Sequence, residues 1–476
     1  MRGLIVDLFA GGGGASLGIE RATGRSPDYA INHDKIALGV HERNHPATKH
    51  LHGDVWHYHP RDVVGDREVE LLWLSPTCVH FSQAKGAPLD RREASKSRAL
   101  AWVGPRWARE KRPRLICHEN VAPFEKWGPL GNDGKVRPGK DGFTFRRWVR
   151  EYTREGYNVE WRRLRACDFG APTIRDRLFV QASLDPIVWP DATHGPGLIP
   201  HRGAIECIDW SIPAPSIFAP GRNLVEATMR RVARGVRKHV LKAARPFILS
   251  QYGTARGGRS IDESLPTVLA GRSKEYLVVP SLVHLSNGER PGQAPRIYDP
   301  QKPLSTIVAG GVKHGLVAAM LVKHFGGHEG SGMSVLDPLG AVTTRDHHAL
   351  VTCMLGDRRE EVRSFLRRFR EDAWKERFLR GSPAQTSLFG EADDDLVRVD
   401  GEVYAIADIG MRNLAPRELA RGQGFHDGYV IEETASGQPV SLTKQVALIG
   451  NSVAPHVAEA LVRANWDNAA ADRRVA

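Results

Sequence analysis

A cysteine and a glutamate follow two apolar runs of the chain, where strand ends are expected. Cys78 comes shortly after the run at 71–74, and Glu119 follows the run at 115–118. Such runs are typical of buried parallel strands, whose carboxyl ends gather at one edge of an open α/β sheet. A lone cysteine is most often a small core residue, but Pro76 and the polar loop after Cys78 favour a strand end. The sequence therefore predicts a nucleophile and a carboxylate at the same edge.

A glycine-rich turn lies near the start of the chain. The apolar run at 4–9 leads into Ala-Gly-Gly-Gly-Gly at 10–14, and a helix is expected next. Glycines let a backbone approach a ligand closely at the start of a helix. Such turns also bind phosphates or simply pack. Because no Lys-Ser/Thr pair follows, a Walker-type phosphate loop is disfavoured, while a dinucleotide-binding fold stays open on this segment alone.

Three parts of the chain differ in pattern. Residues 1–185 alternate strand-like and helix-like segments, which predicts a doubly wound α/β domain for catalysis and cofactor binding. A proline-rich stretch then leads into residues 186–411, a candidate second domain. Residues 412–476 are expected to return to the first domain.

The middle part contains an internal repeat. Similar Asp/Pro/Thr-containing segments begin near residues 262, 299 and 337, and an apolar pair follows each of them. Glycine and proline between short Val/Ile/Thr-rich runs predict repeated β-hairpins, either as a packing module or as a binding surface. A basic stretch at 229–245 suits a solvated helix face or a phosphate-binding surface. An amphipathic helix is expected at 357–380, and another helix at 447–460.

Composition narrows the class of protein. The chain has 476 residues and a net charge of +12, which suits a polyanionic partner. Its five cysteines are scattered without a CxxC pair, which disfavours a disulfide scaffold and a zinc site and favours a reducing compartment. No run of about 18 apolar residues predicts a membrane span. We therefore expect a cytoplasmic protein without a metal.

Six segments, taken in order, resemble the motifs of the cytosine-C5 DNA methyltransferase family. They are Asp-Leu-Phe-Ala-Gly-Gly-Gly-Gly at 7–14, Pro-Thr-Cys-Val-His-Phe-Ser at 76–82, Glu-Asn-Val at 119–121, Arg-Asp-Arg at 175–177, the segment from Arg417 to Phe425, and the segment from Gln445 to Val453. The resemblance covers residues 1–182 and 412–465. It implies a Rossmann-like methyltransferase sheet with a large, β-rich inserted target-recognition domain.

The resemblance also implies a chemistry. S-adenosyl-L-methionine would donate a methyl group to C5 of a cytosine flipped out of duplex DNA, after Cys78 adds to C6 of the ring. Glu119 would hydrogen-bond N3 and the exocyclic amine, and Arg175 would hold O2. Arg177 would brace Glu119 or a phosphate, and Asn120 would fix the loop that carries Cys78. The cofactor would be bound by Phe9, Ala10, Gly11, Gly13, Asn32, Asp54, Pro76, Asn451 and Val453.

Three positions depart from the family pattern. Thr77 stands directly before the cysteine where the family has proline, and Thr173 stands where the Arg-x-Arg motif usually begins with glutamine. Asn32 falls where an acidic residue is expected to bind the cofactor ribose. Asparagine can still form a hydrogen bond to a ribose hydroxyl, but without the strength that a charge adds.

We expect a DNA cytosine-5 methyltransferase that acts as a monomer on double-stranded DNA, in a bacterial nucleoid or a phage-infected cell. A cognate restriction endonuclease is a candidate partner. Two alternatives stay open: an RNA cytosine methyltransferase, which the large middle insertion disfavours, and a catalytically silent DNA-binding protein.

Overall fold

The computed structural model describes the first part of the chain and its C-terminal part almost completely, and separate stretches between them. The described residues are 3–76, 97–131, 135–202, 204–207, 209, 212, 215–223, 229, 233, 247–249, 276–284, 297–298, 314–323, 348–352, 358–369, 396–399, 402–405, 409–413 and 415–475. Within this part of the chain, no helix combines the length and the apolar character that crossing a membrane requires.

A seven-stranded sheet forms the centre of the first part, with the strand order β3-β2-β1-β4-β5-β7-β6. Its strands are β1 (Leu4–Leu8), β2 (Tyr29–Asn32), β3 (Lys49–His52), β4 (Val69–Leu74), β5 (Leu115–Asn120), β6 (Asn158–Arg165) and β7 (Asp176–Ser183). The first five strands of this order are parallel, and β7 is antiparallel to both of its neighbours. This confirms the predicted doubly wound, Rossmann-like sheet.

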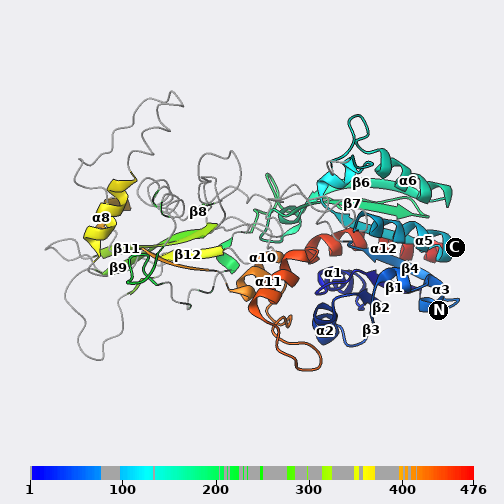
Figure 1. Cartoon of the computed structure of the whole chain (residues 1–476), viewed down its shortest axis with the longest axis horizontal. Helices are drawn as coiled ribbons and strands as arrows, with labels where there is room; N and C mark the ends of the chain where they lie inside the picture. The colour runs from blue at the N-terminus through cyan, green and yellow to red at the C-terminus, as the bar shows by residue number, and fades with distance from the viewer. Residues whose placement is uncertain are drawn as a thin grey trace.

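Helices cover both faces of this sheet. They are α1 (Gly14–Thr23), α2 (Lys35–Asn44), α3 (Pro60–Val64), α5 (Val103–Lys111), α6 (Phe143–Arg154) and α12 (Pro455–Val475). Successive strand residues point to opposite faces, so in β4 Leu72 packs with α3, α5 and α6, whereas Trp73 packs with α1 and α12. Figure 1 shows α12, in red, lying across the sheet beside α1, so the C-terminal part completes the core of the first part.

The C-terminal part contains two further helices, α10 (Pro416–Gln423) and α11 (Leu442–Asn451). The expected single helix at 447–460 is wrong. Ser452 is extended at the end of α11, and Pro455 begins α12. The break arises because proline fits the first turn of a new helix but not the interior of an old one.

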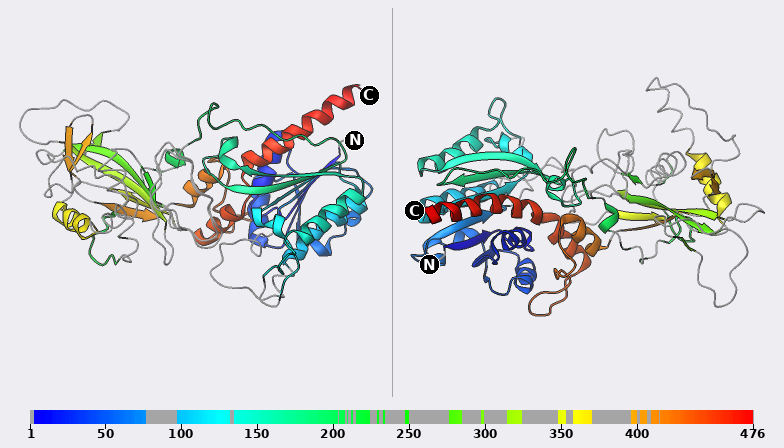
Figure 2. Two further views of the ribbon diagram at one scale, coloured as in Figure 1. Left: turned by 90° about the horizontal axis from the view of Figure 1, so that it is seen from above. Right: turned by 180° about the vertical axis from the view of Figure 1, so that it is seen from behind.

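A second sheet is built from the middle part of the chain, in the order β10-β9-β8-β11-β12-β15. Its strands are β8 (Phe247–Leu249), β9 (Tyr276–His284), β10 (Ile297–Tyr298), β11 (His314–Lys323), β12 (His348–Thr352) and β15 (Gly410–Asn413), and a separate pair is formed by β13 (Leu396–Val399) and β14 (Glu402–Ala405). The three apolar pairs of the repeat lie in β9, β11 and β12. Figure 2 shows this sheet at the opposite end of the molecule from the seven-stranded sheet.

The amphipathic helix α8 (Arg359–Arg368) lies within the range expected for it. Its apolar side chains Val362, Phe365 and Leu366 are buried, as is Phe369 directly after it. The repeat segments near 262, 299 and 337 lie outside the described residues, as do Cys78, the loop after it, and most of the basic stretch at 229–245. The division at 411 falls inside β15, and the domain limits stay a prediction.

Candidate active site

A cavity of about 870 Å³ lies at the carboxyl edge of the seven-stranded sheet. The ends of β1, β2, β4 and β5 all contribute to its lining, as open α/β sheets predict. Six of the predicted cofactor residues line it, namely Phe9, Gly11, Asn32, Asp54, Pro76 and Asn451, together with two predicted catalytic residues, Glu119 and Arg175.

The turn after β1 brings the backbone to the edge of this cavity. Phe9 and Gly11 both have positive φ, 64° and 54°, and Phe9 N–H donates to the carbonyl of Ile31 at 2.9 Å. Phenylalanine rarely adopts this conformation, so the surrounding hydrogen bonds hold it there. The turn thus brings Phe9, Gly11 and Gly12 to the cavity.

Three predicted cofactor residues are not among the residues that line the cavity. Ala10 packs against Ala30 and Leu38, and Val453 packs in the core beside α1 and α12. A side chain at Gly13 would overlap the hydroxyl of Tyr429, so this glycine makes room for a residue from the C-terminal part. Whether these three positions touch a cofactor stays a prediction.

Asn32, at the end of β2, is buried and already has an internal hydrogen bond. Its Oδ1 accepts from the backbone N–H of Asp34 at 3.0 Å. Asp34 caps α2 by accepting from the N–H groups of Ile36 and Ala37, and its other oxygen pairs with Lys444 of α11. This bond uses one lone pair of Oδ1 and leaves the amide nitrogen as a donor for a ligand.

Glu119, at the end of β5, faces two arginines across the sheet. Its Oε1 lies 3.2 Å from Nε of Arg177 and 3.6 Å from an Nη of Arg175, and all three side chains are buried. The other Nη of Arg175 donates to the carbonyl of Gly450 at 3.0 Å. Because β7 runs antiparallel to β5, the segment just before β7 returns to the carboxyl end of β5. Two guanidinium groups therefore fix the carboxylate at the cavity wall.

Asn120 connects β5 to the segment that leads toward Cys78. Its side-chain nitrogen donates to the carbonyl of Pro76 at 3.5 Å, and its Oδ1 accepts from the N–H of Val121 at 2.9 Å. Both Ser75 and Pro76 line the cavity. Cys78 itself lies outside the described residues, so its position relative to Glu119 stays a prediction.

A buried polar chain lies behind the glycine turn. Ser16 donates to the carboxylate of Asp7 at 2.6 Å, and Nε2 of His41 lies 2.8 Å from the Ser16 oxygen. Burial raises the pKa of Asp7 to about 7, although the bond from Ser16 opposes that rise. Burial also holds the pKa of His41 well below its ordinary value. Desolvation penalises the charged form of each group, so both favour their neutral forms.

Sequence reasoning missed several residues that line the cavity, among them His33, Asp34, Trp56, Leu100 and Lys444. Trp56 follows Asp54, whose Oδ1 accepts from its N–H at 3.0 Å, and it is 37% exposed. An aromatic residue in a loop after a strand is a sequence signal that could have identified Trp56 as a cavity residue. Lys444 carries no such signal, because it reaches the site only through the packing of α11.

The chain is similar to several known proteins. A profile described as C-5 cytosine-specific DNA methylase matches residues 4–188 and 358–465, more than half of the chain. The type II methyltransferase M.AquIA of Picosynechococcus sp. is 27% identical over 199 residues, which cover 40% of this chain and 77% of that protein. M.DdeI of Desulfomicrobium norvegicum is 25% identical over 319 residues, 64% of this chain and 72% of that protein. The crystal structure of S. pombe Dnmt2 methyltransferase covers 98% of this chain and 99% of its own, with a TM-score of 0.47 and 15% identity.

Proposed function

The chain belongs to the C-5 cytosine-specific DNA methylase family and is a DNA cytosine-5 methyltransferase, and we propose that its cavity holds the cofactor and a flipped cytosine side by side. The observation that carries this proposal is the lining of a single cavity. The glycine turn and Asp54 lie on it together with Glu119 and Arg175. Its volume of about 870 Å³ lies toward the upper end of the range of about 300–1,000 Å³ that is usual for ligand pockets.

The cavity suits S-adenosyl-L-methionine, which the family uses in general. Phe9, Trp56 and Leu448 offer apolar surface for an adenine ring, and Asn32 and Asp54 offer hydrogen-bonding groups. Gly11 and Gly12 would let the backbone approach the amino-acid end. When bound, the cofactor supplies a methyl group on a sulfonium. We keep the full set of proposed cofactor-binding residues: Phe9, Ala10, Gly11, Gly13, Asn32, Asp54, Pro76, Asn451 and Val453. Those that line the cavity should be tested first.

The residues of the chain would prepare the base. C5 of cytosine is a poor nucleophile, so a thiolate of Cys78 first forms a bond to C6 and pushes the ring electrons toward C5. Glu119, once protonated, would donate to N3 and accept from the exocyclic amine, and Arg175 would hold O2 as negative charge builds on the ring. After the methyl group is on C5, a base takes the C5 proton, the C5–C6 double bond re-forms and the thiolate leaves.

Two residues would position this machinery. Arg177, at 3.2 Å from Glu119, would hold the carboxylate in its orientation without touching the base. Asn120 would fix the segment that carries Cys78 through its bond to Pro76. Because the face of a stacked base is closed to a thiol, the cytosine must leave the duplex to enter this cavity.

Trapping on DNA that contains 5-fluorocytosine tests the covalent step. The fluorine blocks removal of the C5 substituent, so wild-type protein should form a stable adduct. Cys78→Ser should lose both the adduct and turnover while it keeps cofactor and DNA binding, because an alkoxide is far harder to form at neutral pH. Cys117→Ser is the matched control, since Cys117 is buried inside β5. An adduct of undiminished yield with Cys78→Ser would remove Cys78 from this role.

The remaining assignments concern substrate and setting. We place sequence recognition in residues 186–411, and we propose a monomer on double-stranded DNA in the cytoplasm, with a cognate restriction endonuclease as partner. Activity on duplex DNA compared with tRNA separates this enzyme from an RNA methyltransferase. Bisulfite sequencing of DNA from cells that express the chain gives the target sequence directly.

A further inference from the structure

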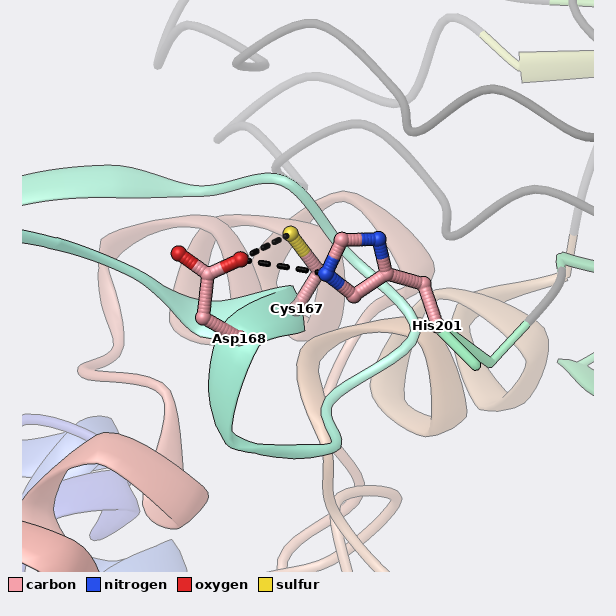
Figure 3. A group of neighbouring side chains, drawn as sticks. All are labelled: Cys167, Asp168 and His201. Atoms are coloured by element: carbon pink, nitrogen blue, oxygen red, sulfur yellow. Dashed lines mark hydrogen bonds and ion pairs between the residues drawn. The ribbon is translucent and has the colours of Figure 1, made fainter. Parts of the chain in front are cut away.

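Three potential metal ligands converge outside the active-site cavity. Cys167 and Asp168 lie in η4 (Ala166–Phe169), the short 3₁₀ helix after β6, and His201 lies beyond β7 in the segment that leads into the middle part. Oδ1 of Asp168 is 3.6 Å from Sγ of Cys167 and 3.1 Å from Nε2 of His201. Figure 3 shows the three side chains pointing toward one another. All three donor atoms lie within 4.8 Å of one another.

Two of the three separations between these donor atoms suit a tetrahedral ion. Zinc binds sulfur at about 2.3 Å and nitrogen or oxygen at about 2.0–2.1 Å, which in tetrahedral geometry places neighbouring ligand atoms about 3.3–3.6 Å apart. The observed 3.6 Å and 3.1 Å differ from those values by only a few tenths of an ångström. A donor set of one sulfur, one nitrogen and one oxygen also suits zinc better than magnesium or calcium, which prefer oxygen alone.

The surroundings of Asp168 already hold these ligands in place. Arg165 donates to both of its carboxylate oxygens, at 3.0 Å and 2.9 Å. This arginine can keep Oδ2 while Oδ1 turns to an ion, and a carboxylate ligand is usually supported by such a second partner. The backbone N–H groups of Thr193 and His194 donate to the Asp168 carbonyl at 2.9 Å and 3.0 Å, which fastens the segment before His201 to η4.

We propose that Cys167, Asp168 and His201 bind a zinc ion, with solvent at the fourth position. Cysteine coordinates as the thiolate, so each ion bound releases the thiol proton to solvent. The ion would join η4, which precedes Arg175 and Arg177, to the first residues of the middle part (186–411). It would thereby fix where the middle part of the chain leaves the catalytic domain. This inference revises the expectation of a protein without a metal, and it is independent of the methyl-transfer proposal.

Cobalt(II) titration of the tag-free, chelator-treated full-length protein tests the site. Bound to the thiolate, cobalt gives a sulfur-to-metal charge-transfer band, and zinc should abolish that band by displacing cobalt. We expect the wild type to bind one equivalent of cobalt. Cys167→Ser and His201→Gln should each lower the affinity for cobalt at least tenfold. Cys117→Ser and His194→Gln are matched controls, because Cys117 lies inside β5 and His194 lies near the cluster with a ring nitrogen bonded to Thr193.

Thermal unfolding supplies a second readout that needs no enzymatic activity. Zinc should raise the unfolding midpoint of the wild type and both controls, and should leave the midpoints of Cys167→Ser and His201→Gln unchanged, because an ion that binds only the folded state stabilises it. Unfolding without metal shows whether each variant has folded, and the partly exposed His201 carries the test if the buried Cys167 does not tolerate change. No thiolate band in the wild type, or a band that both variants keep, would overturn the proposal.

Discussion

Single residues of the glycine turn have different tasks, although they share one residue type. Gly11 has positive φ and borders the cavity, so its task is a backbone conformation beside a ligand. A side chain at Gly13 would overlap the Tyr429 hydroxyl, and one at Gly14 would overlap the Ser452 side chain. These two glycines serve close packing by the C-terminal part, which a motif alone does not reveal.

The effect of adding a negative charge at position 32 can be tested by substitution. Asn32→Glu should tighten S-adenosyl-L-methionine binding by about 1 kcal/mol, or roughly fivefold in Kd, because a carboxylate makes a charge-assisted bond to a ribose hydroxyl. Asn32→Gln lengthens the side chain without a charge and is the control. Isothermal titration calorimetry measures both. Weaker binding of the glutamate variant with an unchanged unfolding midpoint would mean that Asn32 faces another part of the cofactor.

The buried Asp7 predicts a pH dependence of stability. Its pKa is raised to about 7, above the unfolded value of about 3.9. The folded state therefore binds more protons than the unfolded state between these values, and the contribution of Asp7 to stability is lost as pH rises toward and through 7. Asp7→Asn should remove this loss, so the variant gains stability relative to wild type at pH 8 compared with pH 4. Urea unfolding at both pH values measures the difference, and a difference independent of pH would contradict it.

At the scale of elements, the C-terminal part fastens the cofactor turn from behind. The Tyr429 hydroxyl donates to the carbonyl of Gly12 at 2.7 Å and lies 3.2 Å from Nε2 of His45. Gln423 of α10 donates to the carbonyl of Ser452 at 2.8 Å, between α11 and α12. The turn after β1 is therefore held by residues that follow it by more than four hundred positions in the chain.

This contact makes Tyr429 a positioning residue. Tyr429→Phe should weaken S-adenosyl-L-methionine binding by about 1 kcal/mol and raise KM more than it lowers kcat, because a buried carbonyl of the turn loses its partner. Tyr157→Phe is the matched control, since the Tyr157 hydroxyl donates to the carbonyl of Pro113 at 2.7 Å, away from the cavity. The control should lose stability but keep cofactor affinity. Equal cofactor affinities of the two variants would contradict the role of Tyr429.

At the scale of the whole molecule, catalysis and recognition are expected at opposite ends. The cavity must accept any cytosine that reaches it, so discrimination between sequences requires side chains that read neighbouring base pairs. The second sheet, which lies apart from the first, supplies strands that could present such side chains. The loops that join most of these strands lie outside the described residues, so base discrimination within 247–352 rests on the sequence alone.

Two sets of variants separate specificity from affinity. Arg256 and Arg290 lie in two polar stretches, 253–259 and 286–290, that the sequence predicts as loops of the repeat region. Arg256→Ala or Arg290→Ala should change which sites are methylated, because arginine reads guanine by paired hydrogen bonds. Replacing the basic residues at 230–245 by glutamine should instead weaken binding to all DNA sequences by the same factor, because phosphate contacts carry no sequence information. The DNA affinity of this variant should also depend less on the salt concentration. Methylation maps and binding at several salt concentrations measure the two effects. Unchanged motifs in both loop variants would contradict the assignment.

The sequence by itself determined the sheet, the order of its motifs and the strand-end positions of Phe9 and Glu119. These features are local, because an apolar run followed by glycine or a polar residue places that residue at a strand end. Cys78 follows the same sequence pattern, but its strand-end position stays a prediction because it lies outside the described residues.

Only the tertiary structure decided which distant residues meet. It brought Lys444 to Asp34, Tyr429 to Gly12, and Arg175 and Arg177 to Glu119. It also placed His201 beside Cys167 and Asp168, a group of potential metal ligands that the spacing of the cysteines does not indicate. Such contacts depend on how helices pack and on strand order in the sheet, and these follow from the energy of the whole core and not from the pattern of any one segment.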